Sequence, residues 1–286
     1  MQPETSANPP VVNGLSVDVE EWFQVGAFEN VIEKATWPSL TSRVETNTAI
    51  VLDLFAQAGV TATFFTLGWV AARHPALVRR IAAAGHEIAS HGWDHQRVFR
   101  MDATSFRADL RRTRIALEDA SGSAVAGYRA PSFSIDNRTP WAHRVLAEEG
   151  YRYSSSVAPI RHDHYGWREA PRFAFNPVAG SDMIELPVTV AAFGSRRLAT
   201  GGGFFRLLPA GLTDFAVRQV NRRGQPAIFY FHPWEVDPGQ PRVHDAPLRS
   251  QLRHYARLGA MAGKLRGLVE RHAWGRIDSI VGAAAS

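Results

Sequence analysis

The 286-residue sequence contains no cysteine, few lysines and no long apolar run. The lack of cysteine excludes disulfide bonds and thiolate ligands, so any bound metal must be held by histidine and carboxylate side chains. No stretch approaches the roughly 18 uninterrupted apolar residues that a membrane-crossing helix needs, so we expect no membrane span. The first dozen residues lack a basic segment followed by an apolar run, which predicts a cytoplasmic protein without a secretory signal.

The basic charge of the chain comes almost entirely from arginine. Only Lys34 and Lys264 are lysines among the 32 basic residues, and the formal net charge is +5. The basic residues are spread along the chain, which argues against a patch that binds nucleic acid. A solvated surface explains this pattern best, and attraction to an anionic polymer is the alternative.

Short β-rich runs alternate with longer amphipathic stretches along the chain. Strands are expected at residues 14–19, 61–66, 87–90, 126–129, 152–155, 183–186 and 227–231. Helices are expected at residues 43–58, 75–84, 102–120, 139–149 and 209–222. This alternation predicts an α/β fold with a parallel sheet. Seven strands, with no glycine-rich phosphate loop after any of them, favour a closed or nearly closed barrel over a doubly wound sheet.

Two segments depart from this alternation. Residues 158–208 are rich in glycine, proline and aromatic residues and are too long for a simple connection, so we expect an inserted loop or hairpin that shapes a substrate groove. Residues 247–272 are expected to form one C-terminal helix against the barrel, followed by a fraying alanine-rich end. We expect residues 1–286 to form a single domain. The sequence gives no prediction of the oligomeric state.

Polar side chains follow several of the predicted strands at the point where each strand ends. They are Asp18 and Glu20 after the first strand, His91 and His95 after the third, Arg129 after the fourth and His232 after the seventh. Active sites of barrels form at this face, so we expect these side chains to meet there.

The two histidines after the third strand are spaced for metal binding. His91 and His95 are four residues apart, so a helical turn or a tight loop can direct both imidazoles at one cation. Two imidazoles and one carboxylate leave an open position on a divalent ion, where a water molecule can be activated near neutral pH. This set of ligands predicts metal-assisted hydrolysis.

Four sequence motifs resemble those of the carbohydrate esterase 4 polysaccharide deacetylases, which have the NodB homology fold. They are Ser16-Val17-Asp18-Val19-Glu20-Glu21-Trp22, His91 to His95, Arg129-Ala130-Pro131 and His232-Pro233-Trp234. Their order and approximate spacing agree with the family over most of the chain. The resemblance implies a deformed (β/α)7 barrel of the NodB type and an N-deacetylase that removes acetyl groups from N-acetylated sugars of a bacterial exopolysaccharide.

Longer strings are similar to the subgroup found with exosortase-linked exopolysaccharide gene clusters. They span residues 201–207, Gly-Gly-Gly-Phe-Phe-Arg-Leu, and residues 229–235, Phe-Tyr-Phe-His-Pro-Trp-Glu. The resemblance also implies one divalent metal ion, with zinc preferred to cobalt or nickel, and an N-acetylated polysaccharide or oligosaccharide as the substrate.

Carried over by position, the resemblance assigns roles to individual residues. Asp18 is implied as the general base, Arg129 as its ion-pair partner and His232 as the general acid. Glu20, His91 and His95 are implied as the metal ligands. The family commonly has two adjacent aspartates where this chain reads Asp-Val-Glu-Glu, so Glu20 or Glu21 could be the third ligand. Alternation along an extended segment favours Glu20, because it places Glu20 on the same side as Asp18.

The resemblance also suggests residues that contact the substrate. The backbone N–H of Ser132, which follows Pro131, is implied to stabilise the oxyanion. Trp93 and Trp234 each adjoin a proposed ligand or acid and are candidates for the wall of the sugar site. Leu186 is a candidate for the pocket that receives the acetyl methyl group.

One family feature is missing from this sequence. Many members have an aspartate near the strand after the arginine motif, where this chain reads Tyr153-Ser154-Ser155-Ser156. The carboxylate that would lie beside His232 therefore has no obvious counterpart, and Asp163 and Asp237 are the candidates.

Two other functions fit the same residues. Barrels of this type also resemble enzymes that open cyclic amides such as allantoin, but those need a closed pocket, whereas the long insertion favours an open trough. A non-catalytic carbohydrate-binding scaffold would explain the missing aspartate. It would not explain why Asp18, His91, His95, Arg129 and His232 are present together.

Overall fold

The structure of the chain is a computed structural model that describes residues 10–161 and 165–284. Asp163, one of the two candidates for the carboxylate beside His232, lies outside the described residues. No helix in the described part of the chain is long and apolar enough to span a membrane.

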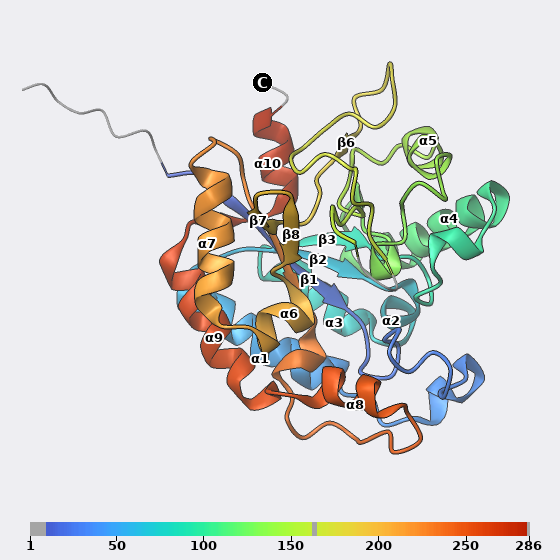
Figure 1. Cartoon of the computed structure of the whole chain (residues 1–286). Helices are drawn as coiled ribbons and strands as arrows, with labels where there is room; N and C mark the ends of the chain where they lie inside the picture. Colours follow the sequence, from blue (N-terminus) through green and yellow to red (C-terminus); the bar gives the residue numbers. More distant parts are fainter. Residues whose placement is uncertain (1–9, 162–164, 285–286) are drawn as a thin grey trace, which may run out of the picture.

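A curled sheet of parallel strands forms the centre of the molecule (Figure 1). Its strands follow the order β10-β1-β2-β3-β4-β5-β6, and β9 also pairs with β1. They are β1 (Asn13–Val19), β2 (Thr63–Thr66), β3 (Glu87–Ser90), β4 (Gly127–Tyr128), β5 (Tyr153–Ser154), β6 (Ile184–Glu185), β9 (Ile228–Phe231) and β10 (Trp274–Gly275). The seven expected strands and the expected deformed (β/α)7 barrel are thus confirmed, and β10 was missed.

The segment after β6 brings the two edges of the sheet together. The backbone N–H of Thr189 donates to the carbonyl of Ile228 in β9 at 2.9 Å. The N–H of Ile228 in turn donates to the Thr189 hydroxyl at 2.8 Å. These bonds connect the last strand of the curl to β9, so the carboxyl ends of the strands surround one common face.

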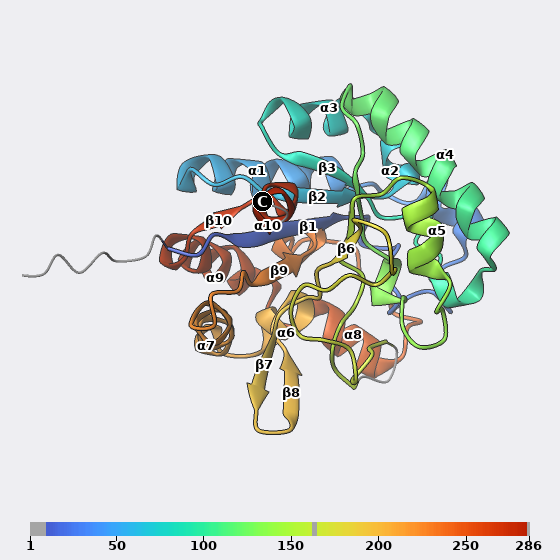
Figure 2. The ribbon, with the colours of Figure 1, turned by 90° about the horizontal axis from the view of Figure 1, so that it is seen from above.

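Helices cover the outside of the sheet (Figures 1 and 2). They are α1 (Val44–Ala58), α2 (Gly68–Arg73), α3 (Pro75–Ala83), α4 (Ala103–Ser121), α5 (Ala142–Glu148), α6 (Gly202–Leu207), α7 (Ala210–Asn221), α8 (Leu248–Tyr255), α9 (Leu258–Arg271) and α10 (Ile277–Ala284). Local sequence sets both ends of helix α4. At the start of the helix, Asp102 accepts a hydrogen bond from the Ser105 N–H, and at its end Gly122 adopts the left-handed conformation.

The insertion expected at residues 158–208 contains a hairpin. Strands β7 (Val190–Phe193) and β8 (Arg196–Ala199) pair antiparallel, and Figure 2 shows them projecting from the barrel. Helix α6 follows the hairpin and begins within the glycine run at Gly202.

The prediction of a single helix over residues 247–272 was wrong. Helix α8 ends at Tyr255 and α9 begins at Leu258, because Arg257 between them has a left-handed backbone with φ of 60°. The two helices bury different partners. His254 and Tyr255 of α8 pack on Phe28, whereas α9 places Met261 in the main core. One straight helix could not present both faces.

Residues 277–284 form α10, a helix that the sequence did not predict, and residues 285–286 of the alanine-rich end lie outside the described residues. The Ile277 N–H donates to the Thr63 hydroxyl at 2.8 Å. The side chains of Ile277, Ile280 and Val281 pack into a buried cluster against the barrel. Apolar residues before the alanines therefore fix α10.

Candidate active site

The polar residues that follow the strands converge on one cavity of about 310 Å³. Asp18 lies in β1 and Glu20 just beyond it, His91 and His95 follow β3, and His232 follows β9; all five line the cavity. Arg129, after β4, lies fully buried beside Asp18. The parallel strands produce this convergence because their carboxyl ends share one face of the barrel.

Glu20, His91 and His95 form a group of potential metal ligands, with one ligand atom from each lying within 4.8 Å of the others. Glu20 Oε2 is 3.0 Å from His95 Nε2 and is buried without a hydrogen-bond partner. His91 Nδ1 lies 2.9 Å from the carbonyl of Arg129. A carbonyl only accepts, so Nδ1 carries the proton and Nε2 is left free as a ligand. The group therefore fits a divalent ion of the zinc type.

The electrostatic environment favours the metal-binding forms of Glu20 and His91. Burial opposes ionisation of Glu20, but His95, His232 and His91 outweigh it and lower the pKa of Glu20 to about 2. Burial lowers the pKa of His91 to about 4, against the opposing charge of Asp18. At neutral pH the site thus offers a carboxylate and a neutral imidazole, which are the protonation states that bind a metal.

Glu21 points away from this group. Its carboxylate accepts hydrogen bonds from the Ser42 hydroxyl and from the backbone N–H groups of Arg43 and Val44, at 3.0 and 3.3 Å for the last two. It thereby binds the N-terminus of α1. Of the two candidate ligands, Glu20 is the one that faces the histidines.

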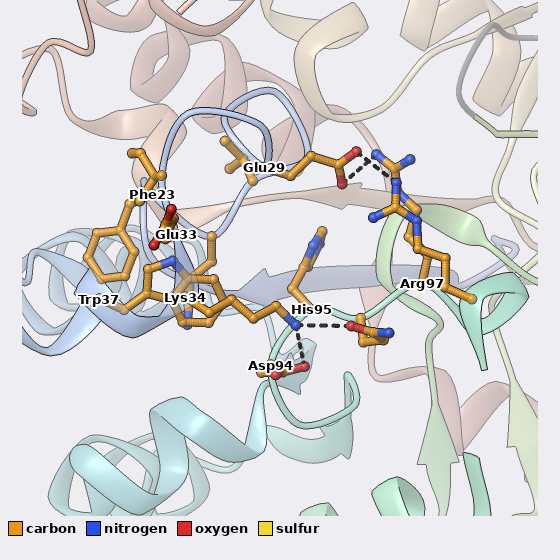
Figure 3. A pocket seen from close by; sticks show the side chains of 13 residues that line it. Phe23, Glu29, Glu33, Lys34, Trp37, Asp94, His95 and Arg97 are labelled. Atoms are coloured by element: carbon orange, nitrogen blue, oxygen red, sulfur yellow. Dashed lines mark hydrogen bonds and ion pairs between the residues drawn. The ribbon is translucent and has the colours of Figure 1, made fainter. Parts of the chain in front are cut away.

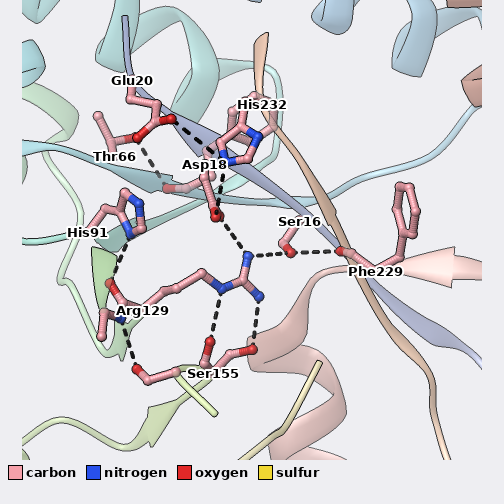
Figure 4. A network of polar contacts seen from close by, with 12 residues as sticks. Ser16, Asp18, Glu20, Thr66, His91, Arg129, Ser155, Phe229 and His232 are labelled. Atoms are coloured by element: carbon pink, nitrogen blue, oxygen red, sulfur yellow. Dashed lines mark hydrogen bonds and ion pairs between the residues drawn. The ribbon is translucent and has the colours of Figure 1, made fainter. Parts of the chain in front are cut away.

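Asp18 is held by a buried network centred on Arg129 (Figure 4). Arg129 Nη1 lies 2.7 Å from Asp18 Oδ1 and also donates to the Ser16 hydroxyl at 2.7 Å. Its Nε and Nη2 donate to the carbonyl and hydroxyl of Ser155 at 2.9 and 2.8 Å. Ser155 thus lies in the stretch where many family members have an aspartate. Its contacts orient Arg129, which pairs with Asp18.

His232 lies beside Asp18 and Glu20 (Figure 4). Its Nε2 lies 4.0 Å from Asp18 Oδ2 and 3.7 Å from Glu20 Oε1. Its Nδ1 lies 2.9 Å from Glu235 Oε1. Burial alone would lower the pKa of His232, but the charges of Glu20, Glu235 and Asp18 and the hydrogen bond to Glu235 together raise it to about 9.

Glu235 is the carboxylate beside His232, a position for which Asp163 and Asp237 were the predicted candidates. Asp237, one of the two candidates, instead binds Arg43 through bonds of 2.6 and 2.9 Å. Glu235 lies three residues after His232 in the turn Pro233–Val236, and this i,i+3 spacing was the available signal.

Arg206 extends this network behind Glu235 and was also missed. Its side chain is fully buried, with Nη1 3.5 Å from Glu235 Oε2 and Nη2 donating to the carbonyl of Arg253 at 2.6 Å. A buried cation requires an opposite charge, and Glu235 supplies it. The polar chain therefore runs from Arg206 through Glu235 to His232.

The residues proposed to contact substrate divide into two groups. Ser132, with a left-handed φ of 54°, and Trp234 line the cavity. Pro131 begins the turn Pro131–Phe133, which contains Ser132, but Pro131 is not itself among the lining residues. Trp93 and Leu186 do not line the cavity either, contrary to expectation.

Trp93 and Leu186 pack against other residues instead of lining the cavity. The Trp93 ring lies beneath the guanidinium of Arg112, whose central carbon is 3.5 Å from the ring centroid. Leu186 is buried in an apolar cluster that includes Phe65 and Phe133. Side-chain packing determines where Trp93 and Leu186 lie. Their closeness in sequence to the motifs did not predict this packing.

Two family models divide most of the chain. Residues 36–154 match the model described as polysaccharide deacetylase, and residues 155–282 match a domain of unknown function, DUF3473. The chain is 32% identical over 141 residues to a chitooligosaccharide deacetylase of Bradyrhizobium sp.. The matched region covers 49% of this chain and 58% of that protein. The chain is also 34% identical over 93 residues to a peptidoglycan-N-acetylglucosamine deacetylase of Bacillus cereus. That matched region covers 32% of this chain and 34% of that protein. These matches span little more than half of the first relative and about a third of the second.

Solved structures share the fold at low sequence identity. A crystal structure of the PuuE allantoinase has a TM-score of 0.61 at 17% identity and covers 96% of this chain and 93% of that chain. A Mycobacterium smegmatis protein assigned as a polysaccharide deacetylase has a TM-score of 0.56 at 20% identity and covers 99% of this chain and 94% of that chain. At these identities the likeness establishes the deformed barrel alone. The family model and the curated relatives add a similarity in sequence: residues 36–154 resemble the polysaccharide deacetylase family, and the partly matching relatives are named deacetylases.

Proposed function

We propose that the protein is a divalent-metal-dependent N-deacetylase that removes acetyl groups from N-acetylated sugars of a bacterial exopolysaccharide. The observation that carries the proposal is that Asp18 and His232 line the same cavity as Glu20, His91 and His95, with His232 Nε2 4.0 Å from Asp18 Oδ2 and 3.7 Å from Glu20 Oε1. The named deacetylase activities of the curated relatives support it. Zinc is the proposed ion, with cobalt and nickel as alternatives.

A divalent ion held by Glu20, His91 and His95 would polarise the acetamide carbonyl and lower the pKa of a water molecule. Asp18 accepts the proton of the attacking water, and Arg129 holds Asp18 ionised and oriented for this step. The backbone N–H of Ser132 stabilises the oxyanion. His232 donates a proton from Nε2 to the departing amine as the C–N bond breaks, so that acetate and a free amino sugar are released.

The network behind His232 orients it for this proton transfer. The bond from Nδ1 to Glu235 leaves Nε2 directed into the cavity, and the nearly parallel ring of Trp234, with its centroid 5.2 Å away, restricts rotation of the imidazole. Glu235 and Arg206 therefore act as positioning residues.

The activity is tested by acetate release from an N-acetylglucosamine oligomer with added zinc, cobalt or nickel. We expect equal amounts of acetate and free amine to form, and we expect allantoin to be left intact in a parallel assay. Consumption of allantoin without acetate release would instead indicate a cyclic-amide hydrolase. Oligosaccharide binding without either reaction would indicate a scaffold.

Glu235→Gln tests the proposed acid. The change removes the negative charge beside His232, so we expect amide hydrolysis to fall on the order of tenfold or more. Hydrolysis of 4-nitrophenyl acetate should fall less, because its leaving group departs without a proton.

Glu185→Gln is the matched control for this variant. Glu185 is a buried glutamate whose Oε2 lies 2.9 Å from Nε2 of His143, outside the cavity. Equal losses of amide and ester hydrolysis in Glu235→Gln would contradict the acid assignment, as would the same amide-specific loss in the control.

A further inference from the structure

Of the charged side chains that line the cavity, Arg253 is the one left without an opposite charge among the described residues. Asp18 pairs with Arg129, and Glu20 belongs to the group of potential metal ligands. Figure 3 shows Glu29 meeting Arg97, whose Nη2 is 3.1 Å from Glu29 Oε2. Arg253 lines the same cavity, its side chain is exposed, and no described carboxylate lies within ion-pair distance of it.

The main chain around Arg253 is fixed from both sides. Its carbonyl accepts the hydrogen bond from buried Arg206, which links it to the network behind His232. The next residue, His254, stacks on Trp234 with ring centroids 4.3 Å apart and planes 16° apart. Arg253 thus lines the cavity from a main chain that is held in place by Arg206 and by the packing of His254.

Arginines also outnumber carboxylates around Glu29, which lines the cavity, and along the segment that contains Arg253. Glu29 is shared by Arg97 and Arg100, at 3.1 and 3.4 Å, so two cations face one carboxylate there. Residues 241–258, which include α8, contain four arginines and a single acidic residue, Asp245. A neutral saccharide would leave these charges unused.

We propose that the cavity binds an acidic saccharide, in which a sugar next to the N-acetylated one carries an oxyanion that pairs with Arg253. The proposal rests on the proposed function for the identity of the sugar that is deacetylated. A guanidinium binds the two oxygens of a carboxylate or a phosphate through parallel hydrogen bonds, and the pairing is both directional and strong. The group that Arg253 would bind is therefore an oxyanion, which either a uronic acid or a sugar phosphate can provide.

Three tetrasaccharide probes distinguish these sources. They are neutral chitotetraose, a tetrasaccharide of alternating glucuronic acid and N-acetylglucosamine, and chitotetraose 1-phosphate. Binding is measured by calorimetry with a chelator present, so that the probes are not consumed, and acetate release is measured separately with metal. We expect Arg253→Ala to weaken binding of an acidic probe about tenfold and binding of the neutral probe by less than about twofold.

Arg249→Ala is the matched control, because Arg249 is exposed on the same helix but does not line the cavity. It should leave all three affinities unchanged. Raising the salt concentration should weaken binding of the acidic probe to the wild type and have much less effect in Arg253→Ala.

The outcomes separate this inference from the proposed function. A loss confined to the glucuronic acid probe identifies a uronic acid, and a loss confined to the phosphate probe identifies a sugar phosphate. Equal affinities for all three probes, or equal effects of the two arginine variants, overturn the inference. Selective binding of an acidic probe without acetate release from any probe overturns the proposed function and leaves the acidic-ligand site standing.

Discussion

His95→Ala is expected to lose its bound metal and, with it, hydrolytic activity. His95 Nε2 lies 3.0 Å from Glu20 Oε2, so the variant keeps a carboxylate and one imidazole where three ligands stood. Two protein ligands hold a zinc-type ion far less tightly than three. After dialysis against trace zinc, cobalt and nickel, elemental analysis should find about one ion per wild-type chain and almost none in the variant.

The control for this experiment is His272→Ala. His272 lies 3.2 Å from Asp214, outside the cavity, so its removal should leave the metal content unchanged. Thermal unfolding monitored by circular dichroism verifies that each variant is folded. Metal retained in folded His95→Ala would place the ion elsewhere, and no metal in the wild type would favour the scaffold function.

Asp18→Asn is expected to lower kcat for deacetylation by about 10² to 10⁴, the contribution usual for a general base. Asparagine has nearly the shape of aspartate and can still accept a hydrogen bond from Arg129, but it cannot take a proton from water. KM should change much less than kcat, because the loss falls on the transition state. Metal content should stay at the wild-type value, since Asp18 is not among the ligand group.

Asp136→Asn controls for the loss of a buried carboxylate that pairs with an arginine. Asp136 binds Arg138, does not line the cavity, and should be dispensable for turnover. An active Asp18→Asn enzyme with normal metal content would contradict the assignment of Asp18 as the base. Loss of metal in Asp18→Asn would assign it to the ligand set instead.

The sequence predicted the convergence of site residues because that convergence depends on topology. In a parallel sheet, residues just after each strand share one face, so strand assignments alone placed Asp18, His91 and His232 together. Alternation likewise separated Glu20, which faces the histidines, from Glu21, which binds the start of α1.

The remaining features depend on packing that one sequence does not specify. Glu235 and Arg206 are 29 positions apart in the numbering, and their ion pair forms because α6 lies against the turn after β9. Trp93 neighbours His91 in sequence, yet its ring turns outward to Arg112. The break at Arg257 depends on the separate partners of α8 and α9, which periodicity does not show.

The boundary between the two family models falls directly after β5, inside the parallel sheet. Strand β5 pairs with β4 on one side and with β6 on the other. Arg129 comes from the first segment and Ser155, to which it donates, from the second, whereas Asp18 precedes both. The proposed site therefore needs both segments, because His91 and His95 lie in the first and His232 lies in the second. A protein fragment that holds only one of the two segments would lack either the proposed histidine ligands or the proposed acid.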